Sequence, residues 1–259
     1  MVAAGEAILE TRGLAKDFKG FVAVDGVSLS VRRGEIHALI GPNGAGKTTF
    51  FNLLTKFLQP SAGAILYQGA DITRAQPADI AARGIVRSFQ ISAVFPNLTV
   101  LENIRIALQR PLGVSFYFWR SPGSLARLNA QAVALLAQVG LEAWADTLAA
   151  DLAYGRKRAL ELATTLALEP QLMLLDEPTQ GMGHEDVARV TQLIKTVAAN
   201  RTVLMVEHNM SVVASIADTI SVLQRGHLIA SGPYAQVSRD PLVIEAYMGT
   251  SATSLGSTH

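Results

Sequence analysis

Short runs of apolar residues, each bounded by glycine, proline or polar residues, mark the strands that the sequence predicts. Ile36–Ile40, Leu172–Leu175 and Thr202–Val206 are runs of this kind, typical of parallel strands buried on both faces. Val27–Val31 instead alternates apolar and polar positions, which indicates an antiparallel strand with one face in water. Further strands are predicted at Ile8–Phe18, Val22–Val31, Ala64–Tyr67 and Ile85–Gln90, and in a hairpin of Asp218–Leu223 and His227–Ala230. The pattern predicts an α/β fold with an additional antiparallel sheet.

Residues 91–168 follow a different pattern, because β-branched runs fade there and helical spacing takes over. One helical face is formed by Leu125, Leu128, Ala132, Leu135 and Val139, and a second by Ala159, Leu162, Ala163 and Leu166. We therefore predict a helical subdomain at 91–168, inserted into an α/β core made of residues 1–90 and 169–249. The Ser/Thr/Gly-rich residues 250–259 are predicted to form a flexible tail.

The composition excludes several classes of protein. The 22 Lys and Arg residues nearly cancel the 21 Asp and Glu residues, so the net charge of +1 gives no reason to expect a nucleic-acid partner. The absence of cysteine excludes disulfides and thiolate metal sites, and it fits a reducing cytosol. No apolar run approaches the ~18 residues of a membrane-spanning helix, and Met1–Glu6 lacks the features of a secretory signal. If the protein acts at a membrane, we expect another chain to cross it.

A glycine-rich stretch follows the predicted strand Ile36–Ile40 and fits the phosphate-binding P-loop pattern. It reads Gly41, Pro42, Asn43, Gly44, Ala45, Gly46, Lys47, Thr48 and Thr49. Glycines let successive backbone N–H groups point at one anion, Lys47 adds a charge for the β- and γ-phosphates, and the Thr48 hydroxyl is suited to Mg²⁺. A helix is predicted from Thr48 to Lys56, with its N-terminus facing the phosphates. The alternative is an ordinary glycine-rich turn. Lys47 and Thr48, the predicted strand before the loop and the predicted helix after it all argue against this alternative.

Two adjacent carboxylates follow the apolar run Leu172–Leu175. Asp176 is placed to bind Mg²⁺ through water, and Glu177 to polarise a water that attacks the γ-phosphate. A structural role for the pair is the alternative, but the P-loop favours the catalytic interpretation. Asp176 and Glu177 are therefore our candidate metal ligand and catalytic residue.

Polar residues also end two other predicted strands, where ligands of parallel sheets bind. His208 follows Thr202–Val206 by one residue and is suited to donate to a phosphate oxygen. Gln90 ends Ile85–Gln90 and is placed to contact Mg²⁺ or a water near the γ-phosphate. Read in isolation, Gln90 is a loop glutamine and His208 a surface or core histidine.

Three further features have both a functional and a structural interpretation. Phe18 is suited to stack on a nucleotide base, or it is a core residue of its strand. Leu152–Arg158 opens a helix with a glycine and three basic residues, which indicates an anion site or a solvated basic turn. The aromatic residues Phe116–Trp119 form a partner-docking surface or pack locally under a loop.

Taken together, these stretches resemble the ATP-binding subunits of ABC transporters from Leu9 to about Gly249. The motifs occur in the family's order: A-loop aromatic Phe18, Walker A Gly41–Thr49, Q-loop Gln90, signature Leu152–Arg156, Walker B Asp176, catalytic Glu177, D-loop Gly181–Gly183 and switch His208. The resemblance implies that Phe18 stacks on adenine, that Gln90 links the γ-phosphate site to the helical subdomain, and that His208 senses the γ-phosphate. It also implies an ABC-type P-loop NTPase fold.

The resemblance further implies how such a chain works. Two ATP-binding subunits pack head to tail, and each Mg²⁺-ATP lies between the Walker A of one subunit and Ala153, Tyr154 and Gly155 of the other. Closure on ATP and opening after hydrolysis drive transmembrane permease subunits, which a solute-binding protein serves indirectly. The chain is expected at the cytoplasmic face of the bacterial inner membrane, with no nucleic acid.

The sequence departs from the family pattern at two places. The usual signature Leu-Ser-Gly-Gly-Gln is replaced by Leu152–Arg156, so Ala153 lacks the serine hydroxyl and Arg156 stands for glutamine. Arg156 is a candidate source of compensating charge. The D-loop has Gly183 where the family has Asp. Both departures make a heterodimer with a related subunit a credible alternative to a homodimer.

Four stretches are similar to importers of branched-chain amino acids and related small solutes, namely Ala153–Gly155, Arg87–Gln90, Leu98–Asn103 and Asp240–Gly249. Alternatives are an ATPase of lipopolysaccharide export, a soluble ABC ATPase acting on DNA or ribosomes, and a nucleotide-binding regulator without turnover. Soluble ABC ATPases usually carry a coiled-coil arm, zinc cysteines or tandem cassettes, whereas this chain has a single P-loop and no cysteine. The importer is therefore our principal hypothesis.

Overall fold

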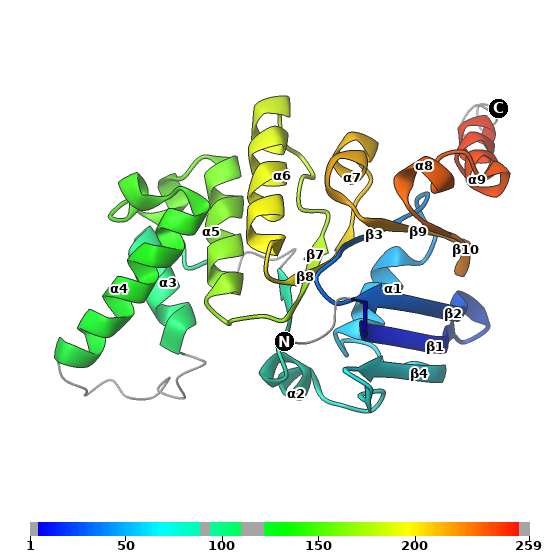
Figure 1. Cartoon of the computed structure of the whole chain (residues 1–259), viewed down its shortest axis with the longest axis horizontal. Helices are drawn as coiled ribbons and strands as arrows, with labels where there is room; N and C mark the ends of the chain where they lie inside the picture. The colour runs from blue at the N-terminus through cyan, green and yellow to red at the C-terminus, as the bar shows by residue number, and fades with distance from the viewer. Residues whose placement is uncertain (1–4, 89–93, 110–121, 254–259) are drawn as a thin grey trace.

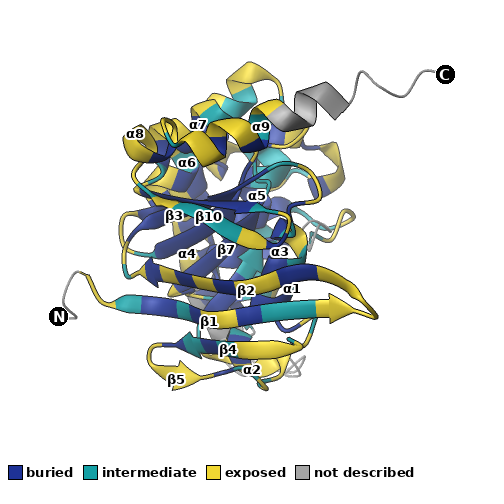
Figure 2. Ribbon diagram, turned by 90° about the vertical axis from the view of Figure 1, so that its right-hand side faces the viewer, coloured by how far each residue is buried: buried dark blue, intermediate teal, exposed yellow. Residues whose placement is uncertain are grey.

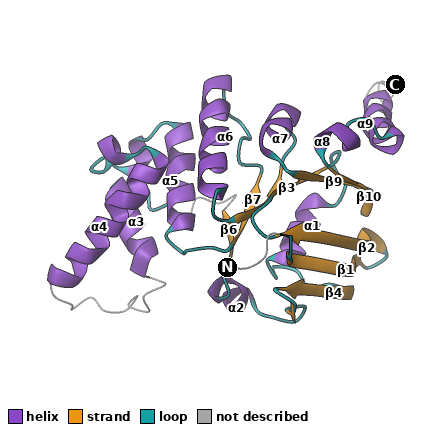
Figure 3. Ribbon diagram, viewed as in Figure 1, coloured by secondary structure: helices purple, strands orange, loops and turns teal. Residues whose placement is uncertain are grey.

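The structure, a computed structural model, describes residues 5–88, 94–109 and 122–253. A six-stranded sheet in the order β10-β9-β3-β8-β7-β6 forms its centre (Figures 1 and 3). All neighbours in this sheet are parallel except the edge hairpin of β9 and β10. Its strands are β3 (Ile36–Ile40), β6 (Ile85–Ser88), β7 (Leu172–Asp176), β8 (Thr202–Val206), β9 (Thr219–Gln224) and β10 (His227–Gly232).

A second, antiparallel sheet lies beside the first and has the order β2-β1-β4-β5. Its strands are β1 (Ala7–Phe18), β2 (Phe21–Arg32), β4 (Ala62–Tyr67) and β5 (Ala70–Asp71). The predicted strands of both sheets are thus confirmed, as is the hairpin at Arg225-Gly226. The last two residues of the predicted strand Ile85–Gln90 lie outside the described residues, and Gln90 is one of them.

Most of the described helices lie on one side of the parallel sheet, and α1 lies between it and the antiparallel sheet (Figures 1 and 3). They are α1 (Lys47–Leu54), α2 (Pro77–Ala82), α3 (Val100–Gln109), α4 (Pro122–Val139), α5 (Tyr154–Leu166), α6 (His184–Ala198), α7 (Met210–Ile216), α8 (Tyr234–Val237) and α9 (Pro241–Thr253), with 3₁₀ turns at Glu142–Trp144 and Ala149–Asp151. Helix α9 includes residues 250–253, so the predicted tail begins in a helix, which corrects that boundary. Residues 254–259 and the aromatic stretch Phe116–Trp119 lie outside the described residues.

Alternate residues of the parallel strands enter two different cores, as a strand period of two requires. In β7, Met173 and Leu175 pack with the helices α3 to α7, while Leu172 and Leu174 pack with α1 and the antiparallel sheet. Figure 2 shows the buried residues of β3 and β7 and the alternation of buried and exposed residues along β1 and β2. Phe50 and Phe51 of α1 are fully buried in the second core. Helix α1 is therefore fixed between the two sheets.

The predicted helical block is formed by α3, α4 and α5, which pack on one another at one end of the molecule (Figure 1). Its apolar residues, such as Leu128, Ala132 and Leu160, belong to the same buried cluster as the face of β7 and β8. Among its described residues, the block is thus continuous with the core of the sheet. Its treatment as a domain with bounds at 91 and 168 stays a prediction.

Candidate functional site

The loop between β3 and α1 is shaped by glycines with positive φ, at Gly41 (151°), Gly44 (76°) and Gly46 (100°). An ideal Cβ on Gly46 would lie 2.3 Å from the carbonyl oxygen of Ala23, and one on Gly41 would lie 2.1 Å from that of Leu223. The loop is therefore held tightly between β2 and β9. The Phe50 N–H donates to the Gly46 carbonyl at 2.8 Å, which starts the helix at the end of the loop.

Gly46→Ala should destabilise the protein more than Gly44→Ala. Both substitutions place a side chain at positive φ, which costs about 1 kcal/mol or more. Only the alanine at Gly46 meets backbone, because no atom lies within 4 Å of the Cβ position at Gly44. The added overpacking at Gly46 should cost about a further 1–3 kcal/mol. Urea unfolding of the two variants measures the difference, and equal losses would contradict the steric argument.

Lys47 is the first residue of α1 and turns back into the loop. Its side chain is buried, and Nζ donates to the carbonyl of Gly41 at 2.7 Å and to that of Pro42 at 3.0 Å. Burial lowers the pKa of Lys47, while the nearby charges of Glu177 and Asp176 act in the opposite direction. The ammonium group is thus placed at the mouth of the loop with two carboxylates near it. Thr48 follows it and is exposed.

Asp176 ends β7 with its side chain almost fully buried. Its Oδ2 accepts from Nη2 of Arg87 on β6, and the other terminal nitrogen of Arg87 donates to Oδ1 of Asn52 on α1 at 2.7 Å. The guanidinium of Arg87 also lies 6.0 Å from the ring centroid of Phe51. Arg87 therefore joins the predicted metal ligand to the helix that starts at Lys47. Our sequence analysis did not find this link.

Glu177 follows directly and has a φ of 46°, which is uncommon for a residue with a side chain. Its N–H donates to the carbonyl of Val206 at 2.9 Å, so the chain stays tied to β8 while it turns out of β7. His208 lies just beyond β8, with its side chain 56% exposed. Because β3, β7 and β8 are parallel neighbours, the loop Gly41–Thr49, Glu177 and His208 all lie at the same edge of the sheet.

The residue between β8 and His208 is Glu207, whose side chain is fully buried. Its carboxylate accepts from backbone N–H groups of Thr179, His208 and Asn209 and from the Thr179 hydroxyl. The sequence pattern alone led to no function for Glu207. A carboxylate next to a candidate histidine, at the end of an apolar strand, was the signal that could have found it.

Phe18 ends β1 with 41% of its surface exposed, and the Lys16 ammonium lies 5.1 Å from the centroid of its ring. The interpretation of Phe18 as a core residue of its strand is therefore wrong. An exposed ring is available for stacking, so contact with a nucleotide base stays a prediction.

The signature stretch lies at the start of α5, where Ala153 is the N-cap and provides no side-chain cap. Tyr154 is half exposed, and its hydroxyl donates to the carbonyl of Gln180 at 3.1 Å. Gly155 packs against α6, because an ideal Cβ there would lie 2.4 Å from Oδ1 of Asp186. The signature is thus joined to the loop after β7 in the same chain.

The three basic residues of the signature helix contact residues of their own subdomain. The Arg156 guanidinium lies 3.8 Å from the centroid of the Trp144 ring, Lys157 donates to the Ala150 carbonyl at 2.8 Å, and Arg158 to Glu161 at 2.7 Å. The interpretation as a freely solvated basic turn is therefore wrong. Whether Arg156 compensates for the missing serine hydroxyl stays a prediction.

The oxygen donors at this edge fit Mg²⁺, which proteins bind through one or two carboxylates together with phosphate oxygens and water. Asp176 offers one carboxylate, and Thr48 an exposed hydroxyl one residue after Lys47. In the part of the chain that the structure describes, no group of three His, Cys, Asp or Glu side chains could hold a metal ion. A metal held by Asp176 and Thr48 would take its remaining ligands from phosphate oxygens or water. Gln90, the third predicted metal residue, lies outside the described residues.

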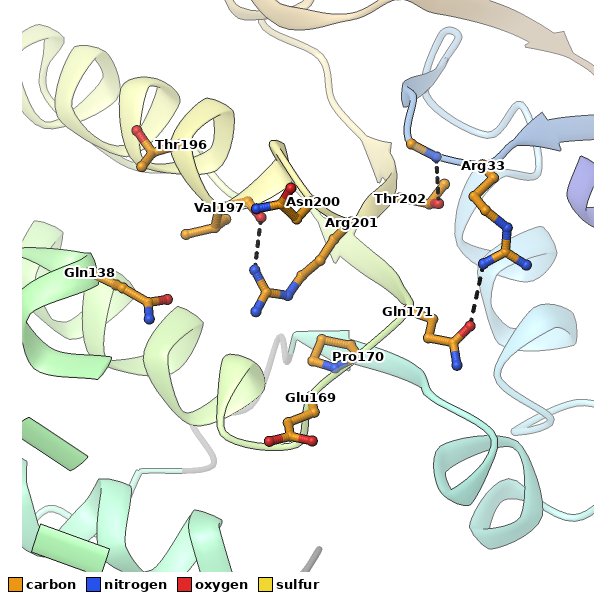
Figure 4. A pocket seen from close by; sticks show the side chains of 11 residues that line it. Arg33, Gln138, Glu169, Pro170, Gln171, Thr196, Val197, Asn200, Arg201 and Thr202 are labelled. Carbon is orange, nitrogen blue, oxygen red and sulfur yellow. Dashed lines mark hydrogen bonds between the residues drawn. The ribbon is translucent and has the colours of Figure 1, made fainter. Parts of the chain in front are cut away.

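A cavity of about 670 Å³ lies at the opposite, amino-terminal edge of the parallel sheet (Figure 4). Its arginines already have protein partners: Arg33 donates to Gln171 at 3.4 Å, and Arg201 to the Val197 carbonyl at 3.2 Å. Ligands of parallel sheets bind at the carboxyl ends of the strands. The cavity is therefore separate from the site formed by the P-loop.

The C-terminal helix α9 also reaches the P-loop. Burial raises the pKa of the Tyr247 hydroxyl, and a hydrogen bond with the backbone of Gly41 acts in the opposite direction.

Within the described ranges, no helix is both long enough and apolar enough to cross a membrane.

Comparison with known families agrees with this geometry. The family described as ABC transporter matches residues 24–180. This chain belongs to the ABC transporter family. The branched-chain amino acid ATP-binding cassette transporter family matches residues 227–253, which include β10 and α9. As an ABC-type ATPase, the chain hydrolyses ATP with the cassette described above.

The relatives of this ABC cassette are similar along nearly the whole chain. The high-affinity branched-chain amino acid transport ATP-binding protein BraF of Pseudomonas aeruginosa is 39% identical over 93% of this chain and 98% of its own length. LivG of Escherichia coli, with the same description, is 36% identical over 94% of this chain and 98% of its own. The crystal structure of the ADP conformation of MJ1267, an ATP-binding cassette of an ABC transporter, is 31% identical, with a TM-score of 0.82 over 94% of this chain and 99% of that one.

Proposed function

We propose that this ABC ATPase powers the import of branched-chain amino acids or related small solutes. The observation that carries the proposal is the match of residues 227–253 to the branched-chain family, at the segment where α9 contacts the P-loop. The similarity to BraF and LivG over more than nine tenths of the chain supports it. Transmembrane permease subunits are the proposed partners, and a solute-binding protein the indirect one. Their ATPase would lie peripherally at the cytoplasmic face of the bacterial inner membrane.

The residues at the carboxyl ends of the parallel strands have the chemistry that ATP hydrolysis requires. Backbone N–H groups of Gly44–Thr49 and the Lys47 ammonium would hold the β- and γ-phosphates of ATP. Glu177 would accept a hydrogen bond from the attacking water and orient it toward the γ-phosphorus, while His208 would donate to a γ-phosphate oxygen. Thr48, Asp176 and the undescribed Gln90 would hold Mg²⁺, which when bound neutralises developing phosphate charge.

A second ATP-binding subunit is proposed to complete each site. In one chain, the signature hydrogen bonds recorded among the described residues go to Gln180, to Ala150 and within α5, and none goes to the P-loop. Ala153 and Tyr154 are exposed, and Gly155 is buried against α6. The backbone of these three residues at the start of α5 is proposed to approach the γ-phosphate held by another subunit, either a copy of this chain or a related one. ATP would bind the closed form of this dimer more tightly than the open form. ATP binding and hydrolysis would therefore close and open the dimer, and this motion would drive the permease subunits.

The proposal is tested by isolating the protein from native membranes in mild detergent and identifying the accompanying chains. We expect two multi-span permease subunits and an ATP-binding partner. After reconstitution into liposomes with the solute-binding protein, ATP turnover should rise on addition of L-leucine and remain at its basal level with D-leucine.

Other outcomes would favour the alternatives. Recovery of the chain alone in the soluble fraction, with steady ATP turnover, would indicate a soluble ABC ATPase. Recovery with membrane subunits whose ATP turnover responds to lipopolysaccharide and is indifferent to amino acids would indicate the export-type ATPase.

A further inference from the structure

Glu207 connects two loops of the ATP site through its two carboxylate oxygens. Oε1 accepts from the N–H of Thr179 at 3.3 Å and from the Thr179 hydroxyl. Oε2 accepts from the N–H of His208 at 2.7 Å and from that of Asn209 at 3.0 Å. One oxygen thus holds the loop that carries Glu177, and the other holds the loop that carries His208.

A gain in folding stability does not explain why the Glu207 carboxylate is buried. Its side chain is 0% exposed, and the imidazole Nδ1 of His208 lies 3.6 Å from Oε2. A buried carboxylate loses several kcal/mol of hydration, which hydrogen bonds only offset, and apolar residues of similar volume are often as stabilising or more so. The four donors therefore point to a role in fixing the geometry of the two loops.

Both loops are tied further into the fold. The Glu177 N–H donates to the carbonyl of Val206, the residue before Glu207, at 2.9 Å. On the other side, Oδ1 of Asn209 caps α7 by accepting from the N–H groups of Ser211 at 3.1 Å and Val212 at 3.4 Å.

A continuous series of contacts also links Glu207 to the signature. Thr179 is followed by Gln180, whose carbonyl accepts from the Tyr154 hydroxyl at the start of α5. The bonded groups therefore run from the cap of α7, through Glu207 and Thr179, to the signature helix.

We propose that Glu207 is a positioning residue that couples the loop of Glu177 to the loop of His208, so that both side chains reach the γ-phosphate together. The proposal rests on the proposed roles of Glu177 and His208. Glu207 itself touches no reacting atom. It acts through the two loops, and the signature helix shares its hydrogen-bonded network.

Glu207→Gln tests the coupling, because the amide NH₂ must face N–H donors of one loop or the other while the side-chain volume is preserved. We expect kcat to fall about 10- to 100-fold, as misplacement of a catalytic group does. The Kd of a fluorescent ATP analogue should change less than about twofold, because no P-loop residue contacts Glu207 in the hydrogen bonds described. An unchanged kcat would overturn the proposal.

Glu35→Gln is the matched control. Glu35 is another buried carboxylate with several donors, but it precedes β3 and lies at the opposite edge of the sheet. Its substitution should lower the thermal midpoint and leave kcat at the parental value. A loss of kcat equal to that of Glu207→Gln would show a general effect of a disturbed buried carboxylate and would overturn the specific role.

A double-mutant cycle with His208→Ala separates positioning from mere stability. If Glu207 positions both loops, part of its effect on kcat passes through His208, so the loss in the double variant should be smaller than the product of the two single losses. Losses of kcat that multiply would overturn the coupling while leaving both catalytic roles intact. A parental kcat in His208→Ala would instead overturn the proposed role of His208, and the coupling with it.

If Glu207→Gln does not fold, Thr179→Val replaces it in the cycle. This variant removes the hydroxyl donor to Glu207, and the same outcome is expected.

Discussion

Glu177→Gln is expected to lower the steady-state rate of ATP hydrolysis by about 10²- to 10⁴-fold, the usual contribution of a positioned acid–base group. Glutamine keeps the size of the side chain and tolerates the turn at φ 46° about as well as glutamate. It lacks the negative charge that orients and polarises the attacking water. Phosphate release at saturating ATP measures the effect.

The same variant should bind ATP with the parental affinity, since the P-loop and Lys47 are untouched. ATP that is bound and not hydrolysed should hold two subunits together, which size-exclusion chromatography with ATP detects as a dimer. Glu169→Gln is the matched control, because Glu169 is exposed at the opposite edge of the sheet. Turnover at the parental rate in Glu177→Gln would refute the assigned role.

Lys47→Ala is expected to remove most of the affinity for ATP. The Lys47 ammonium is buried at the mouth of the loop, where its charge meets the phosphates with little screening by water. Loss of one member of such a charge pair costs about 2–5 kcal/mol, or roughly 30- to 4000-fold in Kd. Titration with ATP by calorimetry measures the Kd directly.

A surface lysine provides the control for this prediction. Lys195→Ala removes the same charge from the exposed last turn of α6 and should leave the Kd for ATP unchanged. Unchanged binding in Lys47→Ala would refute the phosphate-cradle interpretation, whereas equal losses in both variants would indicate an effect of net charge alone.

The elements of this fold could be predicted because each buried strand is a short apolar run with clear ends. Ile36–Ile40 and Thr202–Val206 were predicted from such runs and are β3 and β8. The order of the strands was not available from these patterns, since β3 pairs with β8 and β9 although about 160 and 180 residues separate it from them. Spacing along the chain carries no information on which runs become neighbours.

The same limit explains which site residues were missed. The loop Gly41–Thr49 and Asp176-Glu177 have local signatures, and the structure brings them to one edge. The contact of Arg87 with Asp176 depends on β6 lying beside β7, and that of Glu207 with Thr179 depends on β7 lying beside β8. Contacts across strands therefore require the sheet order before they can be predicted.

The helical block shows a second limit. Helical spacing found its helices, but the same apolar residues pack on the sheet as well as on one another. A periodic pattern predicts which face of a helix is buried, but it does not predict which element packs against that face. The boundaries drawn at residues 91 and 168 therefore describe a change of pattern, while the core continues across them.

The strand order has a consequence for the chain as it leaves the ribosome. Strand β3 is complete at residue 40, yet its neighbours β8 and β9 begin at residues 202 and 219. At about 5–20 residues per second, synthesis leaves β3 without a partner strand for roughly 10–30 s. During that interval the apolar residues of β3, and of α3 and α5 once they are made, lack the complete sheet that buries them in the folded protein. The nascent chain therefore exposes apolar surface, and with it a risk of aggregation, until β8 and β9 have been translated.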